Sequence, residues 1–172
     1  MIFIDKKFIN LYNENMFKEI RKKKNIITLE EIKEVLKKAR RGVLSINDEE
    51  YPYSIPINFY YDDNKEAIYF HSSRIGTKVD LLNKDNKVCF VAIGKEIIKD
   101  LSWAPYVESV VAFGRCNLIK NMDETLQALK KFAMKYYPSE EMVDEEIKVG
   151  SIGVAMYKIE IEHKSGKIVQ EK

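Results

Sequence analysis

The chain has 172 residues, of which 45% are hydrophobic and 33% charged, the composition of one soluble globular domain with a core of its own. Its two cysteines are too few for a disulfide framework, so we expect reduced thiols and a cytoplasmic protein. No apolar run is long enough to cross a membrane, and we expect no membrane partner.

The net charge of +2 is unevenly distributed along the chain. Residues 1–41 contain 12 Lys and Arg against 6 Asp and Glu, a basic excess of the kind that contacts nucleic acids. Glutamates are interleaved with these cations, which favours solvated helix faces over a nucleic-acid interface. Apolar residues recur at helical spacing within residues 1–24. We therefore expect a partly helical N-terminal leader over residues 1–24 and one domain over residues 25–172.

A first well-marked helix is predicted to begin at Thr28. Thr28 and Glu31 have the spacing of a capping box, in which each side chain bonds a backbone N–H of the first turn. Apolar residues then lie on one face of the helix, and Gly42 is a typical stop.

From Gly42 onward, β-branched and aromatic residues predict strands. The six predicted strands are 42–47, 51–61, 67–71, 87–93, 106–118 and 152–161, with helices at 75–82, 121–137 and 140–147. Pro52 and Pro56 predict an edge or a bulge in the second strand, because proline donates no ladder hydrogen bond. Gly114 predicts a bulge or a close backbone approach in the fifth. We expect an α+β, mainly β domain whose antiparallel strands close into a barrel with flanking helices.

Several kinds of functional site lack their characteristic residues. His71 and His163 are the two histidines, and no CxxC or HExxH pattern occurs, so no metal site is expected. The GxxxxGK and GxGxxG loops of nucleotide-binding proteins are absent from the sequence, as is the nucleophile elbow of serine hydrolases.

The segment Phe70–Lys78 combines hydroxyls, an imidazole, two cations and a glycine between a strand end and a helix start. A helix N-terminus offers free backbone N–H groups and a positive dipole end, and both favour a bound phosphate. A polar helix cap beside a surface lysine accounts for the same residues. Taken alone, the segment leaves both interpretations open.

Six short motifs occur in register between about Thr28 and about Lys167. They are Gly42–Ser45, Tyr51–Phe59, Tyr69–Ser72, Gly76–Leu82, Val88–Phe90 and Ser109–Gly114. Their order resembles the pyridoxamine 5'-phosphate oxidase-like FMN-binding split β-barrel superfamily, and within it the nitroimidazole-resistance (Nim-type) flavoproteins most closely. The resemblance implies a six-stranded antiparallel split barrel.

The resemblance also implies that FMN lies in a groove between the two subunits of a homodimer. One strand would line the flavin ring, the segment Phe70–Lys78 would hold the ribityl chain and phosphate, and the partner would supply a tryptophan and part of a strand. The residues placed at the flavin in this way are Pro56, Ile57, Asn58, Phe59, His71, Ser72, Arg74, Gly76, Thr77, Lys78, Trp103, Ser109 and Val110. His71 is the candidate for acid–base catalysis, with a capping or structural role as the alternative, and Trp103 equally suits a core or an interface.

Two features depart from the oxidase itself. The oxidase usually has an Arg-Lys pair for the phosphate, whereas Thr77 precedes Lys78 here and Arg74 is the available substitute. The C-terminal segment with which the oxidase binds pyridoxal phosphate is not recognisable in Glu160–Lys172, so oxidation of a vitamin B6 compound is not expected.

The resemblance thus implies an FMN-dependent oxidoreductase. We expect NADH or NADPH as the electron donor and a small electron-poor acceptor, such as a nitroaromatic or a quinone. The alternative is a non-catalytic protein that binds a flavin, haem or a deazaflavin for sensing or storage.

Overall fold

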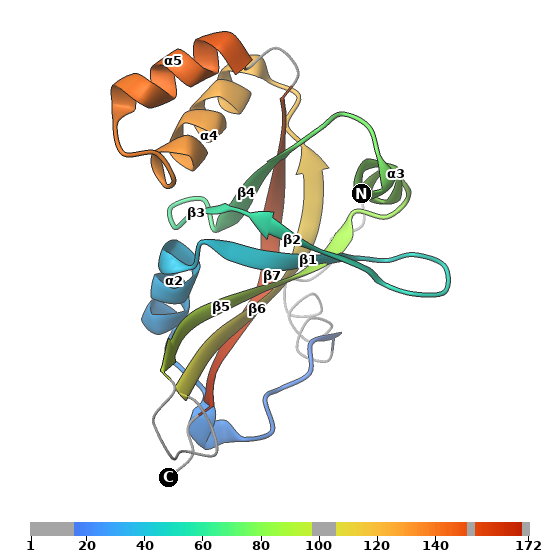
Figure 1. The fold of residues 1–172 in the computed structure, drawn as a ribbon. Coiled ribbons are helices and arrows are strands. Elements are labelled where there is room, and N and C mark those ends of the chain that lie inside the picture. Colours follow the sequence, from blue (N-terminus) through green and yellow to red (C-terminus); the bar gives the residue numbers. More distant parts are fainter. Residues whose placement is uncertain (1–15, 98–105, 151–153, 170–172) are drawn as a thin grey trace, which may run out of the picture.

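The computed structural model describes residues 16–97, 106–150 and 154–169, which form a curled antiparallel sheet surrounded by helices (Figure 1). The sheet has seven strands in the order β2-β1-β5-β6-β7-β4-β3. The strands are β1 (Arg41–Ile46), β2 (Tyr53–Asn58), β3 (Tyr60–Asp62), β4 (Ala67–Ser72), β5 (Lys87–Ile97), β6 (Tyr106–Leu118) and β7 (Ala155–Val169). The helices are η1 (Lys23–Asn25), α2 (Leu29–Lys38), α3 (Thr77–Lys84), α4 (Met122–Met134) and α5 (Glu140–Gly150). The predicted α+β split barrel is confirmed, with one strand more than expected.

The additional strand arises at Phe59. The predicted strand 51–61 is divided into β2 and β3, which lie at opposite ends of the sheet order although one residue separates them. The chain therefore passes from one edge of the curled sheet to the other and brings the two edges together. Phe59 is completely buried, with its ring centroid 4.8 Å from that of Phe90. Its backbone N–H donates to the Tyr136 hydroxyl (2.9 Å), and its carbonyl lies 2.8 Å from the same oxygen.

The interior of the barrel is filled by alternate residues of β1, β5 and β6, together with one face of α2. The strand contributors include Leu44, Ile46, Phe90, Ala92, Val110 and Ala112, and the helix adds Ile32, Val35 and Leu36. The Thr28–Glu31 capping box is confirmed. The expectation that Gly42 ends this helix was wrong, because α2 ends at Lys38 and Gly42 lies within β1. A Cβ there would lie 2.2 Å from the Phe90 ring, so the close approach of the two strands requires glycine.

The bulge and the close backbone approach predicted at Gly114 are both present. The register between β6 and β7 shifts between Phe113 and Gly114, which is a bulge. A Cβ on Gly114 would lie 2.1 Å from the backbone carbonyl oxygen of Glu160, so the two chains also approach closely. Beyond this bulge β7 continues to Val169, eight residues further than the predicted strand 152–161.

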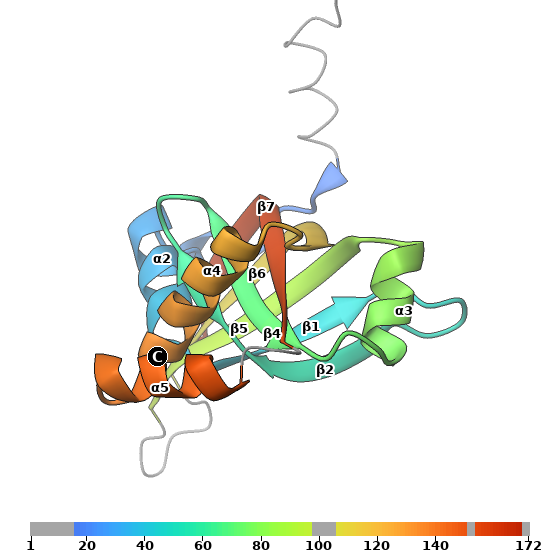
Figure 2. The ribbon, with the colours of Figure 1, turned by 90° about the horizontal axis from the view of Figure 1, so that it is seen from above.

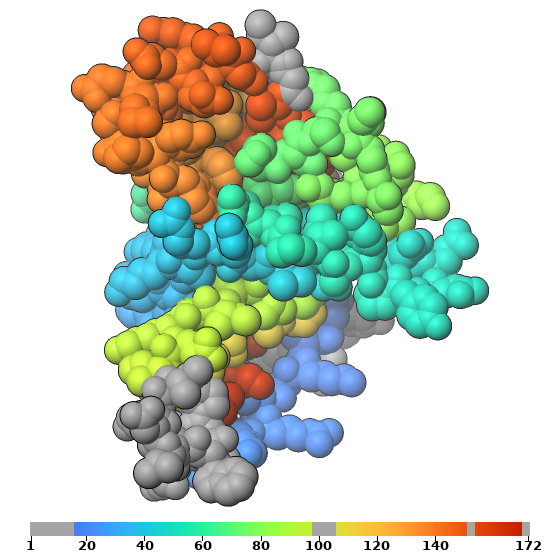
Figure 3. Space-filling model, in the orientation of Figure 1, coloured from blue at the N-terminus to red at the C-terminus, as the bar shows by residue number. Residues whose placement is uncertain are grey.

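Helices α4 and α5 pack side by side outside the barrel, with α4 against β4 and β7, whereas α3 lies beyond the far end of β4 (Figures 1 and 2). Helix α4 covers a second apolar cluster that comprises Ala67, Tyr69, Ala128, Phe132 and Met156. The space-filling view shows the α4–α5 pair as a separate lobe and the β1–β2 turn projecting from the barrel (Figure 3). Among the described helices, none is long and apolar enough to span a bilayer.

Part of the predicted leader, from residue 16 onward, is described. Phe17 stacks on His163 of β7, with ring centroids 4.6 Å apart, so this end of the leader contacts the barrel. Cys116 is buried and Cys89 half-buried, and neither forms a disulfide in the described structure. Burial raises the pKa of the Cys116 thiol to about 12, which keeps it protonated and unreactive.

Candidate functional site

The predicted phosphate-binding segment forms an open turn between β4 and α3. Gly76 precedes the helix with φ = +121°, a conformation that side-chain-bearing residues rarely adopt, and open space surrounds the position of a Cβ. The Gly76 carbonyl accepts from the N–H groups of Val79 and Asp80. Within the described part of the chain, the N–H groups of Thr77 and Lys78 have no acceptor, and they point outward from the helix start.

The charge of this segment is positive. Lys78 is half-buried, with its Nζ 5.3 Å from the centroid of the Phe70 ring, and it has no ion-pair partner among the described residues. Burial lowers its pKa, as expected for an amino group that has left water without gaining a counter-anion. Arg74 is exposed, and no carboxylate occurs between Phe70 and Val79. The turn can therefore accept an anion without first breaking an ion pair.

The side chain of His71 lies on the other face of β4. Successive residues of a strand point in opposite directions. Phe70 points into the barrel, where it stacks on Tyr157 at 5.4 Å, whereas the His71 ring packs edge-on against Phe132 of α4 at 4.9 Å. His71 remains open to solvent on one side, but this packing lowers its pKa, and nearby Lys78 lowers it further. The structure therefore brings Gly76, Thr77 and Lys78 together and directs the His71 ring elsewhere.

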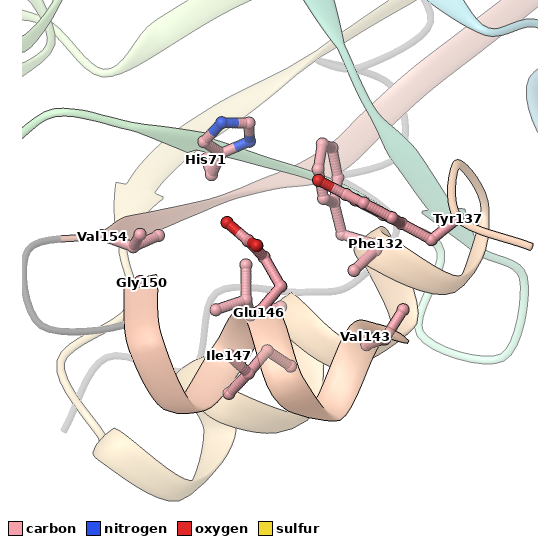
Figure 4. Close-up of a pocket in the computed structure, with 10 residues that line it drawn as sticks. His71, Phe132, Tyr137, Val143, Glu146, Ile147, Gly150 and Val154 are labelled. Carbon is pink, nitrogen blue, oxygen red and sulfur yellow. The ribbon is translucent and has the colours of Figure 1, made fainter. Parts of the chain in front are cut away.

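His71 lines a cavity of about 160 Å³ between β4 and the α4–α5 pair (Figure 4). The remaining walls are mainly apolar and come from Leu129, Phe132, Ala133, Tyr137, Val143, Glu146, Ile147, Gly150 and Val154. In Figure 4 the Glu146 carboxylate extends from α5 toward the strand that carries His71, and both residues line the cavity. The sequence did not single out Glu146, because its place depends on how α5 packs against α4.

The other predicted residues are divided between the surface and the core. Pro56 and Asn58 are exposed on β2, and Asn58 Oδ1 accepts from Arg41 Nε at 3.4 Å. Ser72 and Ser109 are half-buried. The side chains of Ile57, Phe59 and Val110 are buried in the barrel, so these residues can meet a ligand only through their backbone. Trp103 lies outside the described residues.

Two neighbouring residues in the turn after α4, Lys135 and Tyr136, connect this helix to the barrel. The Tyr136 hydroxyl lies 2.6 Å from the Arg40 carbonyl in addition to its contacts with Phe59. Lys135 Nζ donates to the Ala39 carbonyl at 2.6 Å and lies 4.1 Å from the Phe59 ring centroid. Burial is the main cause that lowers the pKa of Lys135 to about 8.

Among the described residues, no group of three or more His, Cys, Asp or Glu side chains is placed to hold a metal ion.

The family profile described as Pyridoxamine 5'-phosphate oxidase matches residues 28–168. The chain belongs to this family. The resemblance drawn from the six motifs is thereby confirmed. No functionally curated protein matches the sequence.

Solved structures with this fold include flavin-binding proteins. A candidate 5-nitroimidazole antibiotic resistance protein from Bacteroides thetaiotaomicron has a TM-score of 0.67 and 25% identity, over 83% of this chain and 86% of that one. A FAD-binding protein from Mesorhizobium loti has a TM-score of 0.61 and 19% identity, over 84% and 97%. A FAD- and haem-binding protein from Mycobacterium smegmatis has a TM-score of 0.68 and 13% identity, over 84% and 72%. The last two similarities concern the fold alone.

Proposed function

We propose that this family member is a cytoplasmic homodimeric flavoprotein that binds FMN and reduces small electron-poor acceptors, such as nitroaromatics or quinones, with NADH or NADPH. The observation that carries the proposal is the open, cationic start of α3, where Lys78 has no counter-anion in the described structure and two backbone N–H groups are free. Membership of the pyridoxamine 5'-phosphate oxidase family supports a flavin as the anionic ligand.

The residues at this turn fit a phosphate monoester. The free N–H groups of Thr77 and Lys78 would each donate to a phosphate oxygen, and the Lys78 ammonium would supply charge from the barrel side. Arg74 would occupy the role of the arginine that usually precedes this lysine in the oxidase. Gly76 leaves the approach open, because no neighbouring atom lies within 4 Å of its Cβ position.

An apolar strip on the outside of the sheet supports the homodimer. Pro56, Val43, Val91 and Val111 are neighbours in register across β2, β1, β5 and β6. Their side chains lie on the face opposite the barrel core, and Val43 is 37% exposed. A second copy seated on this strip would remove these side chains from water.

The protein would position the cofactor and set the electrostatic environment in which it reacts. Bound FMN would supply the electron transfer through its isoalloxazine ring. The chain would fix the cofactor by its phosphate, exclude water through the second subunit and line the ring edge with the backbone of β2. His71 is neutral near pH 7, because its pKa is lowered, and it can donate or accept a proton only for a molecule within reach of the α4–α5 side.

A binding or sensing role is the second candidate. It is favoured by the placement of His71, since the ring of this candidate acid–base residue lies on the face of β4 opposite Phe70 and points away from the turn at Gly76. The same groove would then hold FMN, FAD, haem or a deazaflavin without turnover.

One purification separates these possibilities. The protein is isolated without added flavin, its visible spectrum is recorded, and FMN is added to the remainder. We expect flavin absorbance at once or after addition, and bleaching by NADH or NADPH under anaerobic conditions. Bound flavin that neither nicotinamide reduces would favour the binding role. A colourless protein that takes up no FMN would contradict both.

A further inference from the structure

The cavity between β4 and the α4–α5 pair has the size of a single aromatic ring. Its volume is about 160 Å³. A protein cavity of about 150 Å³ lined by apolar side chains accepts benzene. Pockets that hold molecules of two or more rings measure roughly 300 Å³ and above. The cavity therefore matches one ring and its immediate substituents.

The walls of the cavity combine apolar and aromatic surfaces. Phe132 and Ala133 are buried on the α4 side, and Val143 is completely buried on the α5 side. The rings of His71 and Phe132 meet nearly edge to face, with an interplanar angle of 69°, so they form a corner. A planar ligand in this corner would pack on one ring and contact the edge of the other, which is the arrangement that aromatic rings prefer.

Two polar side chains that line the cavity, those of His71 and Glu146, are exposed to solvent and can therefore bond a ligand in place of water. Within residues 16–97, 106–150 and 154–169, the ring nitrogens of His71 and the carboxylate of Glu146 have no hydrogen-bond partner. The two residues line the cavity from opposite walls, His71 from β4 and Glu146 from α5 (Figure 4). A carboxylate accepts hydrogen bonds and attracts positive charge, while a neutral imidazole has one accepting nitrogen. Glu146 therefore selects a ligand that donates hydrogen bonds and disfavours an anion, and His71 can accept a further hydrogen bond through one ring nitrogen.

We propose that the cavity lined by His71, Phe132 and Glu146 binds a small molecule with one aromatic ring and an amino or amidino group. The ring would lie between Phe132 and the apolar residues of α5, and the nitrogen-bearing group would donate to Glu146 and His71. The cavity is built from one chain and is separate from the turn at Gly76, so the inference extends beyond the proposed flavin chemistry and does not depend on it.

The two histidines of the chain provide a direct readout. His71 lines the cavity, whereas His163 stacks under Phe17 elsewhere on the barrel. Benzylamine is titrated into the full-length protein, with and without FMN, and the imidazole ring protons are followed by NMR. We expect the His71 signals to move and saturate at millimolar benzylamine in both states, while the His163 signals stay in place. Benzoate, with the same ring and the opposite charge, should bind at least about tenfold more weakly.

Glu146→Gln tests the charge that selects the ligand, and Glu145→Gln is its matched control, since both glutamates are exposed on α5 and only Glu146 lines the cavity. We expect the first substitution to weaken benzylamine binding about tenfold and the second to leave it unchanged. The inference is wrong if the His71 signals do not respond to benzylamine, if benzoate binds equally well, or if Glu146→Gln has no effect. FMN uptake is scored separately by absorbance, so failure of the flavin proposal would be recognised on its own.

Discussion

The two faces of β4 contact different parts of the molecule. On one face, Phe70 is buried in the barrel core, where it stacks on Tyr157 and lies beside the Lys78 ammonium. On the other face, Tyr69 and His71 point toward α4 and the smaller apolar cluster. Consecutive residues of one sequence motif thus belong to two environments, a closed core next to a cationic turn and a cavity under a helix pair. A functional role shared by the whole motif does not follow from its continuity in the sequence.

The largest expected difference between the faces is in stability. Phe70→Ala removes a completely buried ring from the barrel and should lower the free energy of unfolding by about 3–5 kcal/mol. His71→Ala removes a side chain that is open to solvent and should cost less than about 1 kcal/mol. Urea denaturation of both variants measures the contrast. Equal losses would show that the face under α4 is packed as tightly as the barrel.

The second difference concerns the flavin. Lys78→Ala should weaken FMN binding about tenfold to a hundredfold, because one charge-assisted hydrogen bond contributes about 1.5–3 kcal/mol. Lys84→Ala, at the opposite end of α3, is the matched control and should leave the affinity unchanged. Flavin fluorescence titration gives both dissociation constants. If the two variants bind FMN alike, the phosphate does not lie at the start of α3.

The features that the sequence predicted well depend on neighbours within a few residues. The capping box of Thr28 and Glu31 is a contact within one turn, and the bulge at Gly114 follows from the missing side chain of a single residue. Features that were missed depend on distant partners. Gly42 is required by Phe90 on another strand, and the break at Phe59 is required by closure of the sheet. No local pattern encodes either contact.

The candidate site also contains residues that the local sequence identified and residues whose position depends on distant partners. Gly76 and Lys78 were identified because a strand end, a glycine and a helix start adjoin in the sequence. The separation of His71 from Lys78 depends on which face of β4 meets α4, and Glu146 enters the cavity through the packing of two helices. The homodimer remains a prediction that rests on the family and on the outer apolar strip.

The third prediction tests how the turn after α4 is joined to the barrel. The Tyr136 hydroxyl accepts from the Phe59 N–H and lies near two carbonyl oxygens. Tyr136→Phe leaves that buried N–H without a partner and should cost about 1–3 kcal/mol of stability. Tyr137→Phe removes a hydroxyl that has no hydrogen-bond partner in the described structure and should change stability by less than about 0.5 kcal/mol. Thermal unfolding that fails to separate the two variants would show that water replaces the hydroxyl.

The smallest effect is expected from Lys135, which lies where α4 meets the barrel. Burial lowers its pKa to about 8 in the folded protein, although the Ala39 carbonyl and the Phe59 ring favour the ammonium form. In the unfolded chain the pKa returns to about 10.4. Between these two values the unfolded chain holds a proton that the native protein has released, so this residue makes the native state more stable as the pH rises.

Lys135→Met removes this titration and leaves the other ionisable groups in place. From pH 8 to pH 10 the free energy of unfolding of the wild type should rise by about 1 kcal/mol relative to that of the variant. This rise is smaller than full linkage would give, because Lys135 is partly exposed. Denaturation curves of both proteins at these two pH values measure this rise in the free energy of unfolding. Subtracting the value for the variant from that for the wild type removes the contribution of the surface ion pairs that the two proteins share. A difference that stays constant with pH would mean that the ammonium is stabilised in place, and that the Ala39 carbonyl and the Phe59 ring outweigh the cost of burial.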